Sequence, residues 1–359
     1  MGTRGKKKSP VKLIVVLSVL AVILALILAA VIYLNNILDD INGGHLTDET
    51  AVVEVVSGDT TAVIADKLEA AGVIQYPAVF RFMAGMEGVD TNLHIGKYEF
   101  AKGEKYEAIL YALKQAPNYR ASVRITFTEG MEVSDVIAKF LAVGAENEAR
   151  WTSVGFEAAL RHDYGYSYIP AADVANRLEG FLYPDTYDFF LDATETELFA
   201  KMIANFNQKA TVAGLEAKAA ARNMTLYEAL TLGSIIQKEA GKVADFNMVS
   251  SVFHNRLRDD WLLQSDAAVS YPIPKEERLP SCTYEQLNTD TPYNVYMHKG
   301  LTPTPICNPS IDAAVAACEP AESDYFYFIG YVDATTGEQI TVFAKTMKEH
   351  QANIDKYLK

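Results

Sequence analysis

The chain has 359 residues, half of them hydrophobic, which is enough for two or three folded units beside a membrane segment. Five of its 32 basic residues lie among the first twelve positions. The remaining 27 basic and 46 acidic side chains give the rest of the chain a net charge of −19. This charge argues against binding to nucleic acid and against lying flat on anionic lipid. A neutral substrate, or one bound by hydrogen bonds and stacking, fits better, and the chain offers 20 tyrosines for such contacts.

An uncharged, almost wholly apolar run of 22 residues extends from Leu13 to Leu34. As a helix it would span about 33 Å, enough to cross the hydrocarbon core of a bilayer. The positive-inside rule predicts a cytoplasmic tail at 1–12 and an extracytoplasmic location for everything after Leu34. The basic residues behind this prediction are Arg4, Lys6, Lys7, Lys8 and Lys12. A cleaved signal peptide is the alternative, but the apolar run is long and Asn35-Asn36 offers no small-residue cleavage site, so we favour a retained single-pass anchor.

Beyond this anchor the pattern indicates a tether and two folded parts. Residues 35–50 are polar and contain two consecutive glycines, as expected of a tether. Residues 51–117 follow the order strand, helix, helix, strand, helix, which indicates a small α/β module. Residues 118–359 begin with a strand at 123–128 and continue mainly as helices, so the fold class predicted for the larger part is mixed α+β.

Several elements of the larger part have sequence signals of their own. Thr194 and Glu197 have the spacing of a capping box, and Asp245 is placed to cap a helix. Residues 271–310 contain seven prolines, which indicates a long, ordered and functional loop. The predicted helices are 133–141, 194–210, 225–240, 245–258 and a final one ending at Leu358, and the predicted late strands are 325–331 and 339–343.

The three cysteines, Cys282, Cys307 and Cys318, all lie in the last third of the chain. A location outside the cytoplasm permits a disulfide, although an odd count leaves at least one thiol unpaired. The sequence leaves both a disulfide and three scattered buried thiols open.

One carboxylate occupies a position where an apolar residue is expected. Leu232, Ile235, Ile236 and Glu239 share one stripe of a predicted helix that ends before Gly241. Apolar surroundings and the negative end of the helix dipole both disfavour the charged form of Glu239 and raise its pKa. A carboxyl with a raised pKa is able to donate a proton at neutral pH. The alternative is a Glu at the edge of the stripe that reaches water beside the helix end.

Several common sites have no counterpart in the sequence. It contains no phosphate-binding Gly-rich Lys-Ser/Thr loop, no His-Glu-x-x-His and no Cys-x-x-Cys, and its six histidines are dispersed. The Gly-x-Ser-x-Gly turn of many serine hydrolases is also missing. The sequence therefore predicts neither a metal ion nor an organic cofactor.

Polar and aromatic side chains instead gather in short segments before and after Glu239. These segments are Glu179–Tyr187, Leu263–Asp266, Thr291–Tyr296 and Gly300–Pro309. Aromatic faces beside amide and carboxylate groups are typical of carbohydrate sites, although each segment by itself also fits a turn or a helix cap. The candidate substrate-binding residues are Glu179, Asp185, Tyr187, Ser234, Gln264, Ser265, Asp266, Tyr293, Asn294, Tyr296 and Asn308.

In order and spacing, these segments resemble the endolytic murein transglycosylases, the MltG/YceG-like family. The motifs that carry the resemblance are Glu-Gly-Phe-Leu-Tyr-Pro-Asp-Thr-Tyr from Glu179, Gly-Ser-Ile-Ile-Gln-Lys-Glu-Ala from Gly233, Leu-Gln-Ser-Asp from Leu263, and Pro-Tyr-Asn-Val-Tyr from Pro292. The resemblance covers the chain from the anchor to the C-terminus. It implies a single-pass inner-membrane protein with a LysM-like module at 51–117 and a catalytic domain at 118–359. It also implies cleavage of the MurNAc–GlcNAc β-1,4 bond in nascent peptidoglycan strands, and association with peptidoglycan synthases and the elongation or division machinery.

The same resemblance implies that Glu239 is the catalytic acid, the second Glu of a helical Glu-Lys-Glu motif. This chain departs from the motif at Gln237, which the helical phase places about 160° away from Glu239. After donating its proton, Glu239 would accept one from the C6 hydroxyl of MurNAc, and a 1,6-anhydro ring would close.

Two other functions are compatible with the sequence. Asp185 or Asp266 could pair with Glu239 in a hydrolase that uses water. Alternatively, the chain could be a membrane-anchored, non-catalytic scaffold that binds peptidoglycan through its small module.

Overall fold

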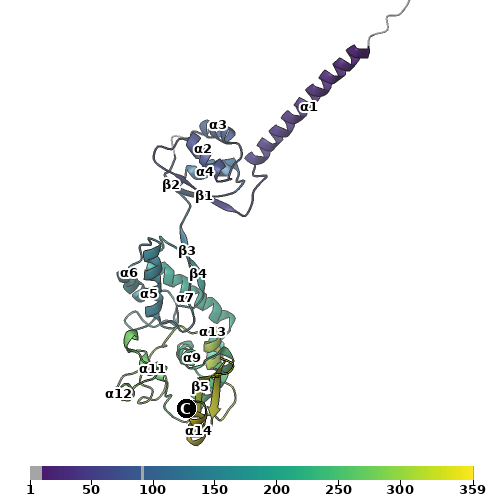
Figure 1. The fold of residues 1–359 in the computed structure, drawn as a ribbon. Helices are drawn as coiled ribbons and strands as arrows, with labels where there is room; N and C mark the ends of the chain where they lie inside the picture. The colour runs from purple at the N-terminus through teal and green to yellow at the C-terminus, as the bar shows by residue number, and fades with distance from the viewer. Residues whose placement is uncertain (1–9, 90–92, 359) are drawn as a thin grey trace, which may run out of the picture. The chain divides into compact units, whose positions relative to one another are not determined.

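The structure is a computed structural model that describes residues 10–89 and 93–358. The chain divides into two compact units, Met1–Arg120 and Ala121–Lys359 (Figure 1). Its helices, and three two-stranded antiparallel sheets among the described residues, give a mixed α+β fold.

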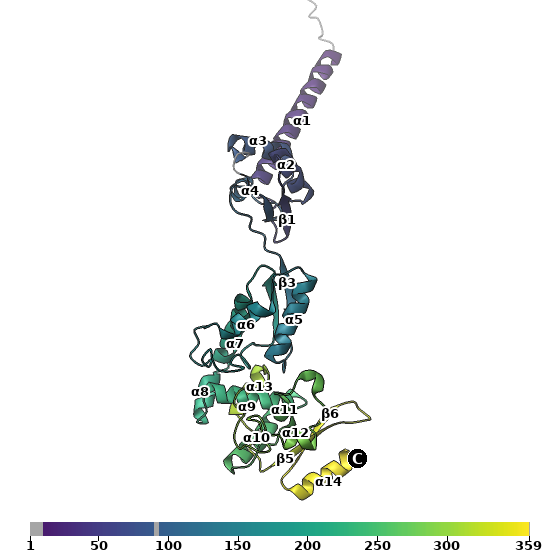
Figure 2. The ribbon, with the colours of Figure 1, turned by 90° about the vertical axis from the view of Figure 1, so that its left-hand side faces the viewer.

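The first unit begins with one long helix, α1 (Pro10–Ile41) (Figure 2). From Ile14 to Ile41 it is long and apolar enough to cross a membrane, and none of its most hydrophobic stretch is buried inside the protein. The helix continues through residues 35–41, where the sequence predicts a polar tether. The reason is that Asp40 is buried: its Oδ2 accepts a hydrogen bond from the backbone N–H of Gln75 at 2.9 Å and another from the hydroxyl of Tyr106.

The rest of the first unit is a small module with the predicted order of elements. Its two-stranded antiparallel sheet pairs β1 (Thr50–Val55) with β2 (Gly96–Ala101). Three helices cover it: α2 (Thr61–Ala70), α3 (Pro77–Met86) and α4 (Tyr106–Leu113). Its likeness to LysM stays a prediction.

The second unit has two hydrophobic cores, and an aromatic cluster fills the first of them. The rings of Phe140 and Phe156 stack at 5.5 Å, and Phe181 and Phe206 meet edge to face at 5.3 Å. The elements around it are β3 (Ser122–Thr126), α5 (Val133–Glu146), α6 (Ser153–Arg161), β4 (Thr186–Phe190), α7 (Glu195–Val212) and α8 (Leu215–Ala221). Of these, β4, α6 and α8 have no counterpart among the predicted elements.

The second core contains the buried face of α9 (Leu226–Glu239). The long loop at 271–310 is mainly irregular and contains only the short helices η3 and α12. The remaining elements are η2 (Val243–Asp245), α10 (Phe246–Arg258), α11 (Asp266–Ser270), η3 (Lys275–Glu277), α12 (Tyr284–Leu287), α13 (Ile311–Cys318), β5 (Tyr327–Val332), β6 (Gln339–Ala344) and α14 (Met347–Tyr357).

The structure confirms one predicted helix cap and corrects another. The Thr194–Glu197 capping box is present at the start of α7. Asp245 precedes α10, but its carboxylate accepts a hydrogen bond from the hydroxyl of Thr341 at 2.6 Å instead of capping the helix. Asp245 therefore fastens α10 to β6.

A close approach of two helices fixes the position of α9. A Cβ atom added at Gly233 would lie 2.8 Å from the Cα of Ala314 in α13. Only glycine permits this distance, so the backbone of α13 sits directly against the middle of α9. The last residue of α9, Glu239, is thereby held in a fixed position relative to α13.

We predict that Gly233→Ala destabilises the second unit. Alanine favours a helix over glycine by about 0.5–1 kcal/mol, but overpacking against the α13 backbone costs about 1–3 kcal/mol, so the net effect is a loss. Denaturant unfolding followed by the fluorescence of Trp151 and Trp261, both in this unit, would measure it.

The control is Gly85→Ala in α3, where an added Cβ has no atom of the described residues within 4 Å. This change should stabilise the first unit by about 0.5–1 kcal/mol, as measured by circular dichroism. Equal stabilisation by both substitutions would contradict the close contact between α9 and α13.

Candidate active site

Glu239 ends the apolar stripe of α9, as the sequence predicts. Leu232, Ile235 and Ile236 are fully buried, and Glu239 is half-buried as the final helical residue. The capping box of Thr225 and Glu228 fixes the other end of the helix. The carboxylate therefore projects from a helix that is capped at its start and packed along its length.

Ser265 holds this carboxylate. Its hydroxyl donates a hydrogen bond to Glu239 Oε1 at 2.5 Å and accepts one from the backbone N–H of Ala268 at 3.2 Å, as the cap of α11. Gln264, just before it, has a φ of +54°, an uncommon conformation for a residue with a side chain. Its N–H bonds to the carbonyl of Val295 at 3.1 Å, while its side chain is exposed.

Removal from water raises the pKa of Glu239 above the usual value for a carboxyl. The hydrogen bond from Ser265 opposes this effect, the negative charge of Asp266 adds to it, and Ala267 and Arg256 lower the pKa by smaller amounts. The net result is a higher pKa, so Glu239 keeps its proton to a higher pH than a carboxyl in water does.

Asp266 lies beside Glu239 and is already hydrogen-bonded through both oxygens. Its Oδ1 accepts from the hydroxyl of Tyr296 at 2.7 Å, and its Oδ2 accepts from the backbone N–H of Cys282 at 3.1 Å. Burial raises the pKa of the Tyr296 hydroxyl, which therefore stays protonated as a donor. The structure thus groups four predicted residues, Gln264, Ser265, Asp266 and Tyr296, with Glu239.

Asn294 and Tyr293 support this group from within the chain. Asn294 is fully buried, and its amide donates to the carbonyls of Leu287 and Thr289 at 3.0 and 2.8 Å. Its Oδ1 accepts from the N–H of Tyr296 at 3.0 Å, the Asx-turn that its sequence also allows. The Tyr293 hydroxyl bonds to Thr304 at 2.9 Å. Asn294 therefore positions Tyr296 and has no free polar group for a sugar.

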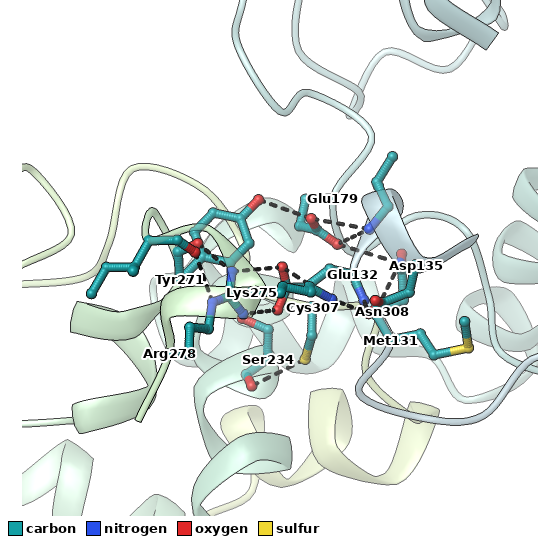
Figure 3. A network of polar contacts seen from close by, with 12 residues as sticks. Met131, Glu132, Asp135, Glu179, Ser234, Tyr271, Lys275, Arg278, Cys307 and Asn308 are labelled. Carbon is teal, nitrogen blue, oxygen red and sulfur yellow. Dashed lines mark hydrogen bonds and ion pairs between the residues drawn. The ribbon is translucent and has the colours of Figure 1, made fainter. Parts of the chain in front are cut away.

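A second buried carboxylate, Glu179, lies in a separate network (Figure 3). It accepts hydrogen bonds from the N–H of Val133 at 3.1 Å, the hydroxyl of Tyr271 at 2.8 Å and the amide of Asn308 at 3.3 Å. Burial raises its pKa to about 8, although the hydrogen bonds from Tyr271 and Val133 oppose the shift.

Next to Glu179 is a cavity of about 1120 Å³. An ion pair between Glu132 and Arg278, with atoms 2.5 Å apart, lines it together with Lys275. Glu239 lies outside the set of lining residues. Lys275 and Arg278 both pair with Glu132 here, so these three charged groups already engage one another.

The helix α11 connects the two carboxylates. Ser265, which caps its start, contacts Glu239, and Tyr271, which follows its last residue, contacts Glu179. Sequence reasoning did not identify Tyr271, Arg278 or Arg256. These residues come from loop or helix positions without a local signal, and only the fold brings them together.

Three other predicted residues lie elsewhere. Asp185 and Tyr187 both accept hydrogen bonds from Asn205 of α7, at 3.0 and 2.9 Å, and the Asn205 bond lowers the pKa of Asp185. Ser234 is fully buried and links α9 to the N–H of Ile306 at 2.9 Å. All three residues form their hydrogen bonds with protein groups other than Glu239.

Gln237 and the cysteines are also accounted for. The Oε1 of Gln237 accepts a hydrogen bond from the N–H of Ser310 at 2.9 Å, at the start of α13 and away from the Ser265 contact.

Cys282, Cys307 and Cys318, all in the described part of the chain, are free thiols. Cys307 and Cys318 are buried. The structure therefore agrees with scattered thiols rather than with a disulfide.

The chain is similar in sequence to two endolytic murein transglycosylases. It is 30% identical over 342 residues to an endolytic murein transglycosylase of Bacillus subtilis, a match that covers 92% of this chain and 90% of that protein. It is 28% identical over 326 residues to an endolytic murein transglycosylase of Streptococcus pneumoniae, covering 85% of this chain and 58% of the longer relative.

A crystal structure of a YceG-like protein from Listeria monocytogenes has a TM-score of 0.55 and 27% identity, and the match covers 85% of this chain and 99% of that one. The model of the YceG-like family matches residues 53–356. These matches show that the chain belongs to the YceG-like family.

Proposed function

We propose that this protein is an endolytic lytic murein transglycosylase that cleaves the MurNAc–GlcNAc β-1,4 bond of nascent peptidoglycan strands. The observation that carries this proposal is the carboxyl of Glu239, half-buried at the end of α9, held by Ser265 and raised in pKa. The names of the relatives, which are endolytic murein transglycosylases, support the substrate class.

The proposed reaction uses Glu239 twice. Its carboxyl donates a proton to the glycosidic oxygen while the bond from that oxygen to C1 of MurNAc breaks. The resulting carboxylate then accepts the proton of the MurNAc C6 hydroxyl, and the C6 oxygen bonds to C1 to close a 1,6-anhydro ring. Glu239 regains its proton, so the cycle is balanced without water.

This mechanism needs one carboxyl, whereas common glycosidases need two. The engagement of both Asp266 oxygens by Tyr296 and Cys282 supports a role for Asp266 as a charged neighbour rather than as a nucleophile. Gln264 and Tyr296 are the candidates for sugar contact, because the side chain of the first is exposed and the ring of the second is half-buried beside Glu239.

The length and composition of α1 support a single-pass anchor in the cell membrane. The basic residues before it support a cytoplasmic N-terminus, with the module and the catalytic domain outside the cytoplasm. In this location the domain would meet newly made glycan strands, and peptidoglycan synthases are the expected protein partners. The LysM-like module would contact glycan or hold the domain close to the membrane.

We predict that Glu239→Gln lowers the rate of strand cleavage by about 10²–10⁴-fold, because the amide cannot donate the proton. Glu228→Gln on the same helix is the matched control: glutamine still forms a capping box, so folding and activity should be retained. The assay uses the full chain in detergent on uncrosslinked glycan strands, with product masses measured by mass spectrometry.

The product masses separate the alternatives. A lytic transglycosylase gives 1,6-anhydro ends that are one water lighter than the ends a hydrolase gives. Ends that are heavier than 1,6-anhydro ends by one water would favour a hydrolase in which Asp266 is the partner of Glu239. Equal cleavage by the wild-type and Glu239→Gln proteins would refute the assignment of Glu239, and no cleavage by either would favour the scaffold.

We also predict opposite pH shifts from the two neighbours of Glu239. Activity requires protonated Glu239, so kcat/KM falls as the pH rises through its pKa. Ser265→Ala removes a hydrogen bond that lowers this pKa. We therefore expect the alkaline limb of kcat/KM to move to higher pH in this variant.

Asp266→Asn removes the negative charge that raises the pKa of Glu239, so the alkaline limb should move to lower pH. The measurement is the midpoint of the alkaline limb of kcat/KM for each variant, not the absolute rate. Shifts of the same sign in both variants would show that another group governs this limb.

A further inference from the structure

Helix α3 presents an apolar ridge to the outside of the small module. Phe82 and Met86 are 69% and 75% exposed, and since they are four residues apart they lie on one face of the helix. Ala78, one turn earlier, is also exposed. The opposite face is the buried one, with Phe80 and Ala84 fully enclosed. We call Ala78, Phe82 and Met86 the α3 ridge.

The charge around the ridge differs from that of the rest of the exterior. The sequence of α3 contains no Asp or Glu, although the chain beyond residue 12 carries a net charge of −19. Its single charged residue, Arg81, forms an ion pair with Asp66 at 3.2 Å. Glu87, which follows the helix, pairs with Lys114 at 2.8 Å. A lipid surface would therefore meet an apolar strip with one cation and no unpaired acid on the helix.

Contacts with α1 hold α3 in a fixed place. The ring of Tyr76, directly before α3, meets the ring of Tyr33 in α1 edge to face at 5.8 Å. The N–H of Gln75 donates to the buried Asp40 of α1 at 2.9 Å, and Asp40 also accepts from Tyr106 of α4. The start of α3 is thus attached to the last part of the apolar helix, where a Tyr is typical of the membrane–water interface.

The orientation of the module agrees with this attachment. In Figures 1 and 2, α3 lies on the side of the module toward which α1 extends, and β1 lies on the opposite side. An amphipathic helix held beside a membrane span can bury its apolar face among headgroups and upper acyl chains.

We propose that the α3 ridge inserts into the outer interface of the bilayer beside α1, so that the module rests on the membrane. This inference relies on the proposed role of α1 as a membrane anchor. The module would then have two attachments to the bilayer, one spanning and one interfacial, and would not swing freely on the helix. The acidic surface elsewhere would face away from the lipid.

The test places a fluorescent reporter on the ridge. The full chain with Phe82→Trp, and separately with Met86→Trp, is reconstituted in vesicles made with and without lipids brominated on the acyl chains. The matched control is Val52→Trp, a residue 43% exposed in β1, the strand that lies on the side of the module opposite α3 in Figures 1 and 2. The parent chain, with Trp151 and Trp261 in the second unit, gives the background.

We expect brominated lipid to quench the added fluorescence of both ridge variants, and to leave that of the Val52→Trp variant unquenched. Two ridge positions are used so that misfolding of one variant does not decide the result. If the chain floats with vesicles but neither ridge reporter is quenched, the interfacial contact is overturned and the anchor stands. If the chain does not float with vesicles, the anchor itself is overturned.

Discussion

The site depends on one contact between two short segments, the hydrogen bond from Ser265 to Glu239. It joins the last residue of α9 to the first turn of α11, and the same hydroxyl caps α11. Because α9 is packed against α13 at Gly233 and Gln237 binds the start of α13, the carboxylate has little freedom at its base. The packing of α9 against α13 and the hydrogen bond from Ser265 together fix the position of the Glu239 carboxylate.

The network around Glu179 supports this arrangement from the other end of α11. Tyr271 ties that end to Glu179, and Glu179 in turn receives hydrogen bonds from Val133 and Asn308, which lie 46 and 129 residues away in the sequence. The hydrogen bonds of Glu179 join segments that are far apart in the sequence, which fits a structural role beside the reactive role proposed for Glu239.

Local patterns in the sequence were sufficient to predict features that depend on near neighbours. The stripe of Ile235 and Ile236 and the capping box at Thr194 are of this kind, because helical periodicity and capping act within a few residues. The strand β4 was missed because it forms by pairing with β3, some sixty residues earlier. Asp40 was assigned to a tether because the groups that bury it, Gln75 and Tyr106, belong to another part of the chain. The same reason explains why Asn294 could not be recognised as an internal support.

Adjacent residues of α11 act on Glu239 in opposite directions. The hydrogen bond from Ser265 stabilises the carboxylate, and the charge of Asp266 destabilises it, so the removal of water decides the outcome in favour of the protonated form. Such a balance fits the proposed role of Glu239, which gives up a proton and then takes one back within a single cycle. A carboxyl held too firmly in either form would perform one of these steps well and the other poorly, because proton transfer is most efficient when the pKa lies near the working pH. In the proposed mechanism, the start of one short helix, α11, would therefore influence both proton transfers of Glu239.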